Sequence, residues 1–304
     1  MKYSHRWFQF IKERFDPLSY SVMFFVFLGA HYAVYLKFLK QGVASNFGHL
    51  LYLIPLILAV FLFFFKLRLF DEIKDIESDA IHHPERPLPR GILRKDDIVR
   101  AVFIIIALEL LLFSFYGLRA LASVVIAIGY SLVMYKEFFS KKWLRAHLTV
   151  YAVTHTFVVI FLSTAIFSAL LNKPLANLPP DLLHFSFGGW FLFNIFEFGR
   201  KTFARQEEKE GINSYSKIFG RFGAVLLVLT MAILSIVFIN SVTTSAVDSG
   251  LLFLWLSVTA VAGFLYAILD RPHLAKIYRF ITSLYIIFTY GTIISAILLN
   301  IIIP

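Results

Sequence analysis

The chain has 304 residues, of which 59% are hydrophobic, and its mean hydropathy of +0.76 is far above that of an ordinary water-soluble domain. It contains no cysteine, which excludes disulfides and thiolate metal sites. The net charge is +10, but the basic residues are scattered in short segments beside apolar stretches. This pattern favours contact with anionic lipids and argues against binding of nucleic acid.

Nine apolar stretches are long enough, or nearly long enough, to cross a bilayer. In chain order they are 20–39, 47–67, 98–117, 119–136, 148–171, 182–199, 217–239, 250–269 and 280–302. A basic leader, 1–16, precedes the first stretch, and the third and fourth adjoin so closely that they predict a tight helical hairpin at Gly117. We therefore expect an all-α membrane protein with nine transmembrane helices in a single domain, 1–304.

The distribution of lysine and arginine predicts the orientation of these helices. If the N-terminus lies inside, only four of the 29 basic residues fall on the outer side, namely Lys37, Lys40, Arg119 and Lys173. Cytoplasmic loops of membrane proteins carry such an excess of basic residues. We expect a multi-pass protein of the cytoplasmic or inner membrane, with its N-terminus inside, its C-terminus outside and the loops 68–97 and 197–217 in the cytoplasm.

The loop 68–97 holds five carboxylates within nine residues. If the second helix continues into it, Asp71, Asp75 and Asp79 follow one another at i, i+4 and i+8. Glu72 then lies within about 100° of that row, and Glu77 falls on the far side. Carboxylates on one stripe of a helix repel each other, and a bound cation would relieve the repulsion.

The chemistry of this row favours magnesium. Sites made of carboxylate oxygens suit Mg²⁺, which shares its coordination with waters and substrate phosphates. Arg68 lies on the same face, where it could meet phosphate oxygens. The loop therefore predicts a site for magnesium and diphosphate at the membrane boundary.

A second polar segment begins at the end of the sixth stretch. On a helix Asn194, Glu197, Arg200 and Lys201 share one face. Placing an amide and a carboxylate at the membrane edge costs free energy unless the two groups bind each other or a ligand. The acidic run after them could supply a second metal ligand, and a solvated connector without a ligand is the alternative interpretation.

The first loop resembles a known family signature. The run Asp71-Glu72-x-x-Asp75-x-x-x-Asp79, followed by Pro84-x-Arg86-Pro87, is similar to the first aspartate-rich motif of the UbiA superfamily of intramembrane prenyltransferases. That motif reads Asn-Asp-x-x-Asp-x-x-x-Asp and then a Pro-x-Arg-Pro turn. The second loop lies where the family has Asp-x-x-x-Asp, but here Phe203 and Glu207 fall near the two aspartate positions.

The resemblance implies Mg²⁺-dependent transfer of a prenyl group from a polyprenyl diphosphate to a small acceptor. The acceptor would be aromatic, such as a quinone precursor, or lipid-like, and the diphosphate would bridge the two active-site loops. Catalysis and metal binding would fall to Asp71, Glu72, Asp75 and Asp79, with further metal ligands among Glu197, Glu207 and Glu208. The diphosphate would be bound by Arg68, Arg86, Lys136, Lys141, Asn194, Arg200 and Lys201.

Some of these assignments have plain alternatives. The family places a tyrosine and a lysine in the loop after the fourth span, which suggests Lys136 or Lys141, although either could simply anchor a helix end. Arg86 lies in a proline-bounded turn and could be an interfacial anchor. The ionisable residues at membrane depth, His31, Glu109 and His155, are functional candidates or partners within the bundle.

Two other functions remain open. An intramembrane terpene cyclase of the same superfamily would use the same metal site without an aromatic acceptor. A secondary transporter would place acidic residues at the bilayer midplane. Only Glu109 is that deep, so the sequence favours the enzyme.

Overall fold

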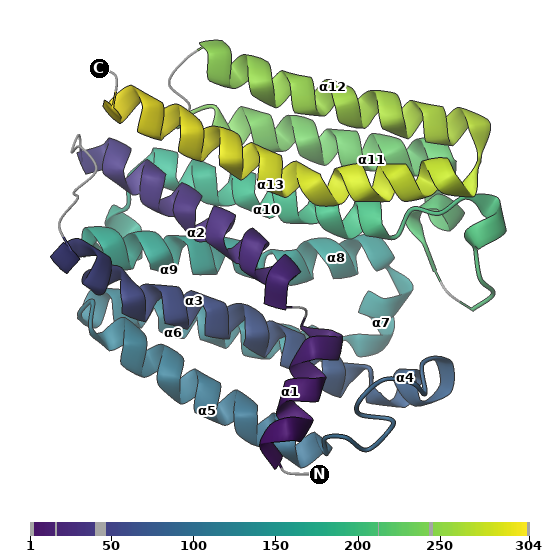
Figure 1. The fold of residues 1–304 in the computed structure, drawn as a ribbon, viewed down its shortest axis with the longest axis horizontal. Helices are drawn as coiled ribbons and strands as arrows, with labels where there is room; N and C mark the ends of the chain where they lie inside the picture. The colour runs from purple at the N-terminus through teal and green to yellow at the C-terminus, as the bar shows by residue number, and fades with distance from the viewer. Residues whose placement is uncertain (1–2, 16, 40–46, 212, 243–245, 303–304) are drawn as a thin grey trace.

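A computed structural model describes residues 3–15, 17–39, 47–211, 213–242 and 246–302. This part of the chain is helical without strands, and its long helices run side by side as one bundle (Figure 1). The long helices are α2 (Pro17–Leu39), α3 (Phe47–Lys74), α5 (Lys95–Ser114), α6 (Leu118–Tyr135), α8 (Leu148–Thr156) continued by α9 (Val158–Leu171), α10 (Pro180–Arg200), α11 (Tyr215–Ile239), α12 (Ala246–Leu269) and α13 (Pro272–Ile302).

Short helices complete the bundle at its ends. They are α1 (Tyr3–Arg14), α4 (Ile76–His82) and α7 (Lys141–Ala146), with 3₁₀ turns at η1 (Glu137–Phe139), η2 (Leu175–Asn177) and η3 (Arg205–Glu207). Helices α4 and α7 lie at the end of the bundle where α3 and α10 finish, at the right of Figure 1. Both acidic loops therefore reach the same end of the molecule.

Seven segments of the described chain are long and apolar enough to cross a membrane. They lie on α2, α3, α6, α8–α9, α11, α12 and α13. The other two predicted spans, 98–117 and 182–199, correspond to α5 and α10, whose apolar stretches contain Glu109 and Glu197. The prediction of an all-α membrane protein is confirmed, whereas the nine-span count and the orientation of the termini remain predictions.

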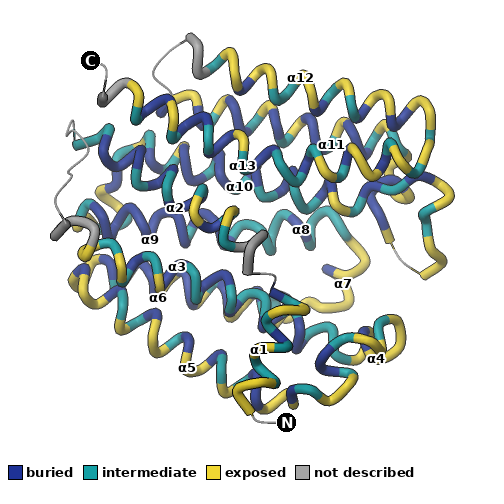
Figure 2. The backbone as a smooth tube through the Cα atoms, viewed as in Figure 1, coloured by how far each residue is buried: buried dark blue, intermediate teal, exposed yellow. Residues whose placement is uncertain are grey.

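The outer surface of the bundle is apolar. Figure 2 shows exposed residues along the outer faces of α5 and α12, and large hydrophobic side chains such as Phe103, Ile104, Phe253 and Leu254 are at least half exposed there. A continuous apolar surface of this kind is unfavourable in water and is what a helix presents to lipid.

The hairpin predicted between the third and fourth stretches is confirmed. Helix α5 ends at Ser114 and α6 begins at Leu118, with Gly117 between them at a φ of 87°. L-residues other than glycine rarely adopt this conformation, because their Cβ crowds the backbone there.

A glycine also sets the distance between α10 and α13. A Cβ added to Gly199 would lie 2.1 Å from Oγ1 and 2.5 Å from Cβ of Thr282, so the two helices would have to separate. We expect Gly199→Ala to lower the free energy of unfolding by about 1–3 kcal/mol, as overpacking typically does. Gly129→Ala is the control, because no atom lies within 4 Å of the added Cβ. Thermal unfolding in detergent should separate the two variants, and equal midpoints would contradict this account of the contact.

Candidate functional site

A cavity of about 200 Å³ lies where α3 and α10 finish, between these helices and α6, α8 and α9. Its apolar wall is formed by Phe64, Leu67, Met134, Ala152, Val158, Val159 and Phe193. Its polar groups are Asp71, Tyr151, His155, Thr156, Glu197 and Arg200. We call this space the site cavity. It brings the start of the first acidic loop together with the polar end of α10, although more than 100 residues separate them in the sequence.

The carboxylate row keeps its helical spacing through a break in the helix. Helix α3 ends at Lys74 and α4 begins at Ile76, but the backbone bonds continue across the gap. The Asp75 amide donates to the Asp71 carbonyl at 3.0 Å, and the Asp79 amide donates to the Asp75 carbonyl at 2.7 Å. The three aspartates therefore retain the i, i+4, i+8 arrangement that the sequence predicts.

Two of these aspartates already have cationic partners. Asp71 pairs with Lys74, whose Nζ lies 2.9 Å from Oδ1. Asp79 accepts a hydrogen bond of 2.5 Å from Arg86 across the proline-bounded turn. Arg86 thus holds the turn against α4, so the residue predicted to bind diphosphate also positions the third aspartate.

Asp75 is different, because within the described residues its carboxylate has no hydrogen bond or ion pair. Burial raises the pKa of Asp75, and the negative charge of Asp71 raises it further. A half-buried carboxylate between two others is unfavourable without a counterion. A bound cation would supply one.

Mg²⁺ fits this donor set. The carboxylates offer only oxygen ligands, and Asp75 has an unfilled coordination capacity. Within the described part of the chain, no three Asp, Glu or His side chains converge to form a complete metal cage. Mg²⁺ usually binds through one or two carboxylates and completes its shell with water and substrate phosphates, so an incomplete cage is consistent with it.

Glu72 lies away from this arrangement. Its side chain is buried, accepts a hydrogen bond of 2.7 Å from Arg14 of α1 and one of 2.6 Å from Arg68, and does not line the site cavity. Arg68 is directed to the same carboxylate. In this structure Glu72 ties the N-terminal helix to α3 through Arg14, and Arg68 pairs with Glu72 within α3.

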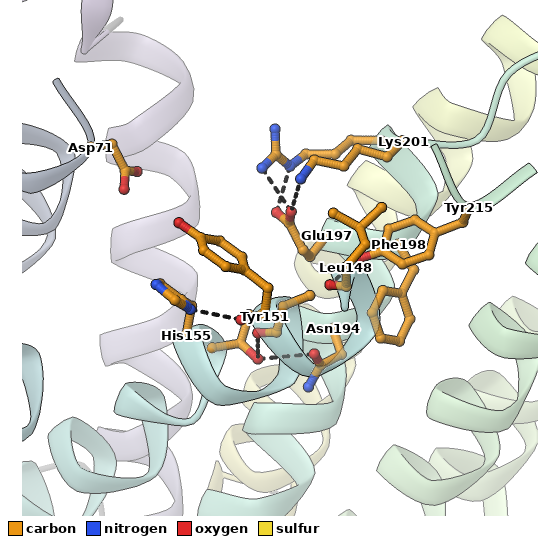
Figure 3. A network of polar contacts seen from close by, with 12 residues as sticks. Asp71, Leu148, Tyr151, His155, Asn194, Glu197, Phe198, Lys201 and Tyr215 are labelled. Carbon is orange, nitrogen blue, oxygen red and sulfur yellow. Dashed lines mark hydrogen bonds and ion pairs between the residues drawn. The ribbon is translucent and has the colours of Figure 1, made fainter. Parts of the chain in front are cut away.

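The polar end of α10 combines one carboxylate with two cations. Glu197 accepts bonds of 2.6 and 2.8 Å from Nε and Nη2 of Arg200, and Nζ of Lys201 lies 3.0 Å away. Figure 3 shows this cluster on one side of the site and Asp71 on the other. Asn194 is engaged within the bundle, because it accepts from Thr156 and donates to the Trp190 carbonyl.

The two remaining glutamates brace the α10–α11 connection. Glu207 accepts two bonds from Arg279 of α13, at 2.6 and 2.9 Å, and these bonds lower its pKa. Glu208 accepts bonds of 2.6 Å from both Ser214 and Ser216. Neither carboxylate lines the site cavity. Arg279 lies 72 residues after Glu207, and Ser214 and Ser216 lie at the start of α11, so spacing near α10 could not reveal these partners.

The predicted lysines of the loop after α6 also lie outside the cavity lining. Lys136 is exposed, with its Nζ 5.2 Å from the centre of the Tyr135 ring, and Lys141 is exposed at the start of α7. Instead α8 supplies Tyr151 and His155, four residues apart on one face. The sequence indicates His155 only as an ionisable group at membrane depth, and it does not identify Tyr151 as a residue of the site.

The two other ionisable groups at membrane depth are paired inside the bundle. Glu109 of α5 lies 2.5 Å from Lys66 of α3, and both side chains are fully buried. Both ring nitrogens of His31 lie 2.7 Å from an oxygen, one from the Phe27 carbonyl and the other from the Ser163 hydroxyl. For these two residues the interpretation as bundle partners is confirmed.

The chain is similar to known membrane prenyltransferases. It matches the UbiA prenyltransferase family over residues 21–295. A solved structure described under "Structural and mechanistic insights into the biosynthesis of Digeranylgeranylglyceryl phosphate synthase in membranes" is 17% identical with a TM-score of 0.57, and the match covers 92% of this chain and 98% of that one. The apo structure of a UbiA homologue from Aeropyrum pernix K1 is 15% identical with a TM-score of 0.58, covering 90% of this chain and 97% of that one.

No curated protein matches the chain by sequence. At identities of 15% and 17% the two solved structures establish a common fold and nothing finer. The family match is broader evidence, because it extends from α2 to α13 and includes both acidic loops. The chain belongs to the UbiA prenyltransferase family.

Proposed function

We propose that this protein transfers a prenyl group from a polyprenyl diphosphate to a small acceptor inside the membrane, in a reaction that requires Mg²⁺. The observation that carries the proposal is the site cavity, which joins an aspartate of the first loop, a cation at the end of α10 and an apolar wall. A prenyl diphosphate has the same division into a charged head and an apolar tail.

Different residues would bind the metal, stabilise the charge of the diphosphate and exclude water. Asp71, Asp75 and Asp79 would hold Mg²⁺, which neutralises the negative charge that develops on the departing diphosphate. Arg200 and Lys201 would add positive charge at the same oxygens. The apolar wall, including Phe64 and Phe193, would exclude water, which would otherwise capture the allylic cation.

The cytoplasmic side is the proposed location of the site. The end of the bundle where α3 and α10 finish carries Lys74, Arg86, Arg145, Arg200 and Lys201. Such enrichment in basic residues is typical of the cytoplasmic face. An aromatic hydroxy compound is the proposed acceptor, and a prenylglyceryl phosphate is the lipid-like alternative suggested by the described neighbour.

The test uses the purified full-length protein in detergent with geranyl, farnesyl or geranylgeranyl diphosphate. Each donor is incubated with and without an aromatic or prenylglyceryl phosphate acceptor, in Mg²⁺ or in EDTA, and products are identified by mass spectrometry. We expect diphosphate release and a prenylated acceptor only with Mg²⁺. A cyclic hydrocarbon formed without acceptor would support the terpene cyclase instead. Failure to release diphosphate from every donor would contradict both enzymes.

A further inference from the structure

Helix α8 places His155 in the lining of the site cavity, and one of its two ring nitrogens already has a hydrogen-bond partner. Nδ1 of His155 lies 2.7 Å from the carbonyl oxygen of Tyr151, one turn earlier. A carbonyl oxygen can only accept, so Nδ1 carries a proton and donates. The other nitrogen of the neutral ring, Nε2, is then a hydrogen-bond acceptor with a free lone pair.

This second nitrogen is buried and has no hydrogen-bond partner in the described structure. Buried polar atoms are nearly always hydrogen-bonded, so an unfilled acceptor in a cavity points to a ligand that supplies the donor. His31 shows that the same fold can satisfy both nitrogens of a membrane-depth histidine, through Phe27 and Ser163. His155 lines the site cavity, and His31 does not.

The ring of His155 is held in place. It stacks on Tyr151 with centroids 3.8 Å apart and planes 15° apart, and it meets the Phe138 ring nearly edge-on at 5.9 Å. Figure 3 shows the imidazole beside Tyr151 on α8, on the side of the site where Asp71 lies. An acceptor bound in the site cavity beside His155 would meet a nitrogen held in a fixed position.

The ionisable groups around His155 come from three helices. Asp71 and Lys74 belong to α3, Tyr151 to α8, and Glu197 and Arg200 to α10. Asp71 is already paired with Lys74, and Glu197 with Arg200. His155 therefore offers the site cavity a free lone pair, and its ring has no ion-pair partner in the described structure.

We propose that His155 is a catalytic residue whose Nε2 takes the proton of the acceptor's hydroxyl group. This inference rests on the proposed function and deepens it, because it requires an acceptor that carries a hydroxyl, phenolic or alcoholic. The bond between the allylic carbon and the diphosphate oxygen breaks, and its electron pair leaves with the diphosphate. The new bond forms from the acceptor oxygen, or from a phenol ring carbon activated by it, and the hydroxyl proton moves to Nε2, which leaves His155 as an imidazolium. After attack by a ring carbon, the proton on that carbon leaves to the released diphosphate as the ring regains aromaticity, and the imidazolium returns its proton to the oxygen.

The main variant is His155→Phe, which keeps a stacking ring on Tyr151 and removes both nitrogens. General base catalysis contributes about 10²–10⁴-fold, so we expect kcat for prenyl transfer to fall about 100-fold. The KM for the prenyl diphosphate and the Kd for a non-hydrolysable analogue should stay within about twofold, because the diphosphate site is untouched. A purely structural role would change binding and kcat together.

His147→Phe is a matched control. Its Nδ1 also bonds a carbonyl one turn earlier, at 2.8 Å from Trp143, and its ring also stacks on that residue. It is exposed and does not line the site cavity, so the variant should transfer prenyl groups like the wild type.

His155→Ala offers a rescue. Removing the ring leaves room for free imidazole, which we expect to restore transfer in this variant and not in His155→Phe, where the phenyl ring fills the space. Retention of wild-type transfer by His155→Phe, loss of donor binding along with turnover, or absence of rescue would each overturn the assignment. A wild-type protein that releases no diphosphate from any donor defeats the proposed function itself, and the role of His155 falls with it.

Discussion

Asp75→Ala should reduce Mg²⁺-dependent diphosphate release at least about 100-fold while leaving the protein folded in the membrane. Asp75 is the member of the carboxylate row that has no cation partner among the described residues, so a metal would bind most directly to it. Burial and Asp71 raise its pKa, which means that its charged form is disfavoured in the folded protein. Removing the carboxylate should therefore leave thermal stability equal or higher, although activity is lost.

This combination separates a metal ligand from a structural acid. Glu77→Ala is the control, because Glu77 is exposed on α4 and belongs to none of the contacts of the row. It should retain nearly full activity. The measurement is diphosphate release across a Mg²⁺ titration, paired with thermal unfolding of each variant. If both variants lose the same activity, the segment is an acidic structural helix and the metal assignment is wrong.

The sequence was most informative where local spacing carries the information. Asp71, Asp75 and Asp79 keep their helical register because the i to i+4 backbone bonds continue through the break between α3 and α4. Gly117 likewise determines the hairpin, and the lengths of the apolar stretches determine the membrane helices. These features depend on neighbours within a few residues, and the pattern of side chains is sufficient to predict them.

The sequence was least informative where a partner lies far along the chain. Glu72 resembles its neighbouring aspartates in spacing, but Arg14 of α1 reaches it from 58 residues away. Glu207 similarly meets Arg279, 72 residues on. Such pairings depend on how helices assemble, and a helical wheel cannot show them.

His155 illustrates a different difficulty. Its depth was evident from the sequence, but its free nitrogen follows from the backbone contact with Tyr151 and from the cavity. His31 looks the same in the sequence and is fully satisfied. The two histidines can be told apart only by the geometry around each ring.

Arg200→Met should weaken binding of a non-hydrolysable prenyl diphosphate analogue by about 10–100-fold in the presence of Mg²⁺. Arg200 lines the site cavity opposite Asp71, and Glu197 balances only one of the two cations that contact it. The surplus positive charge would be neutralised by an anion that bridges the two loops. Lys201→Met should weaken binding as well, because Lys201 shares the same carboxylate, and diphosphate release from a native donor should fall in parallel.

Arg205→Met provides the control for these two variants. Its side chain is 85% exposed, its nearest acidic partner is Asp270 at 3.9 Å, and it does not line the site cavity. Binding of the analogue, measured by titration calorimetry in detergent, should match the wild type. Unchanged affinity in Arg200→Met and Lys201→Met would show that the diphosphate does not bind at this end of α10. A wild-type protein that transports a solute across proteoliposomes and releases no diphosphate from any donor would be a transporter and not an enzyme. The two cations would then bind a transported ion.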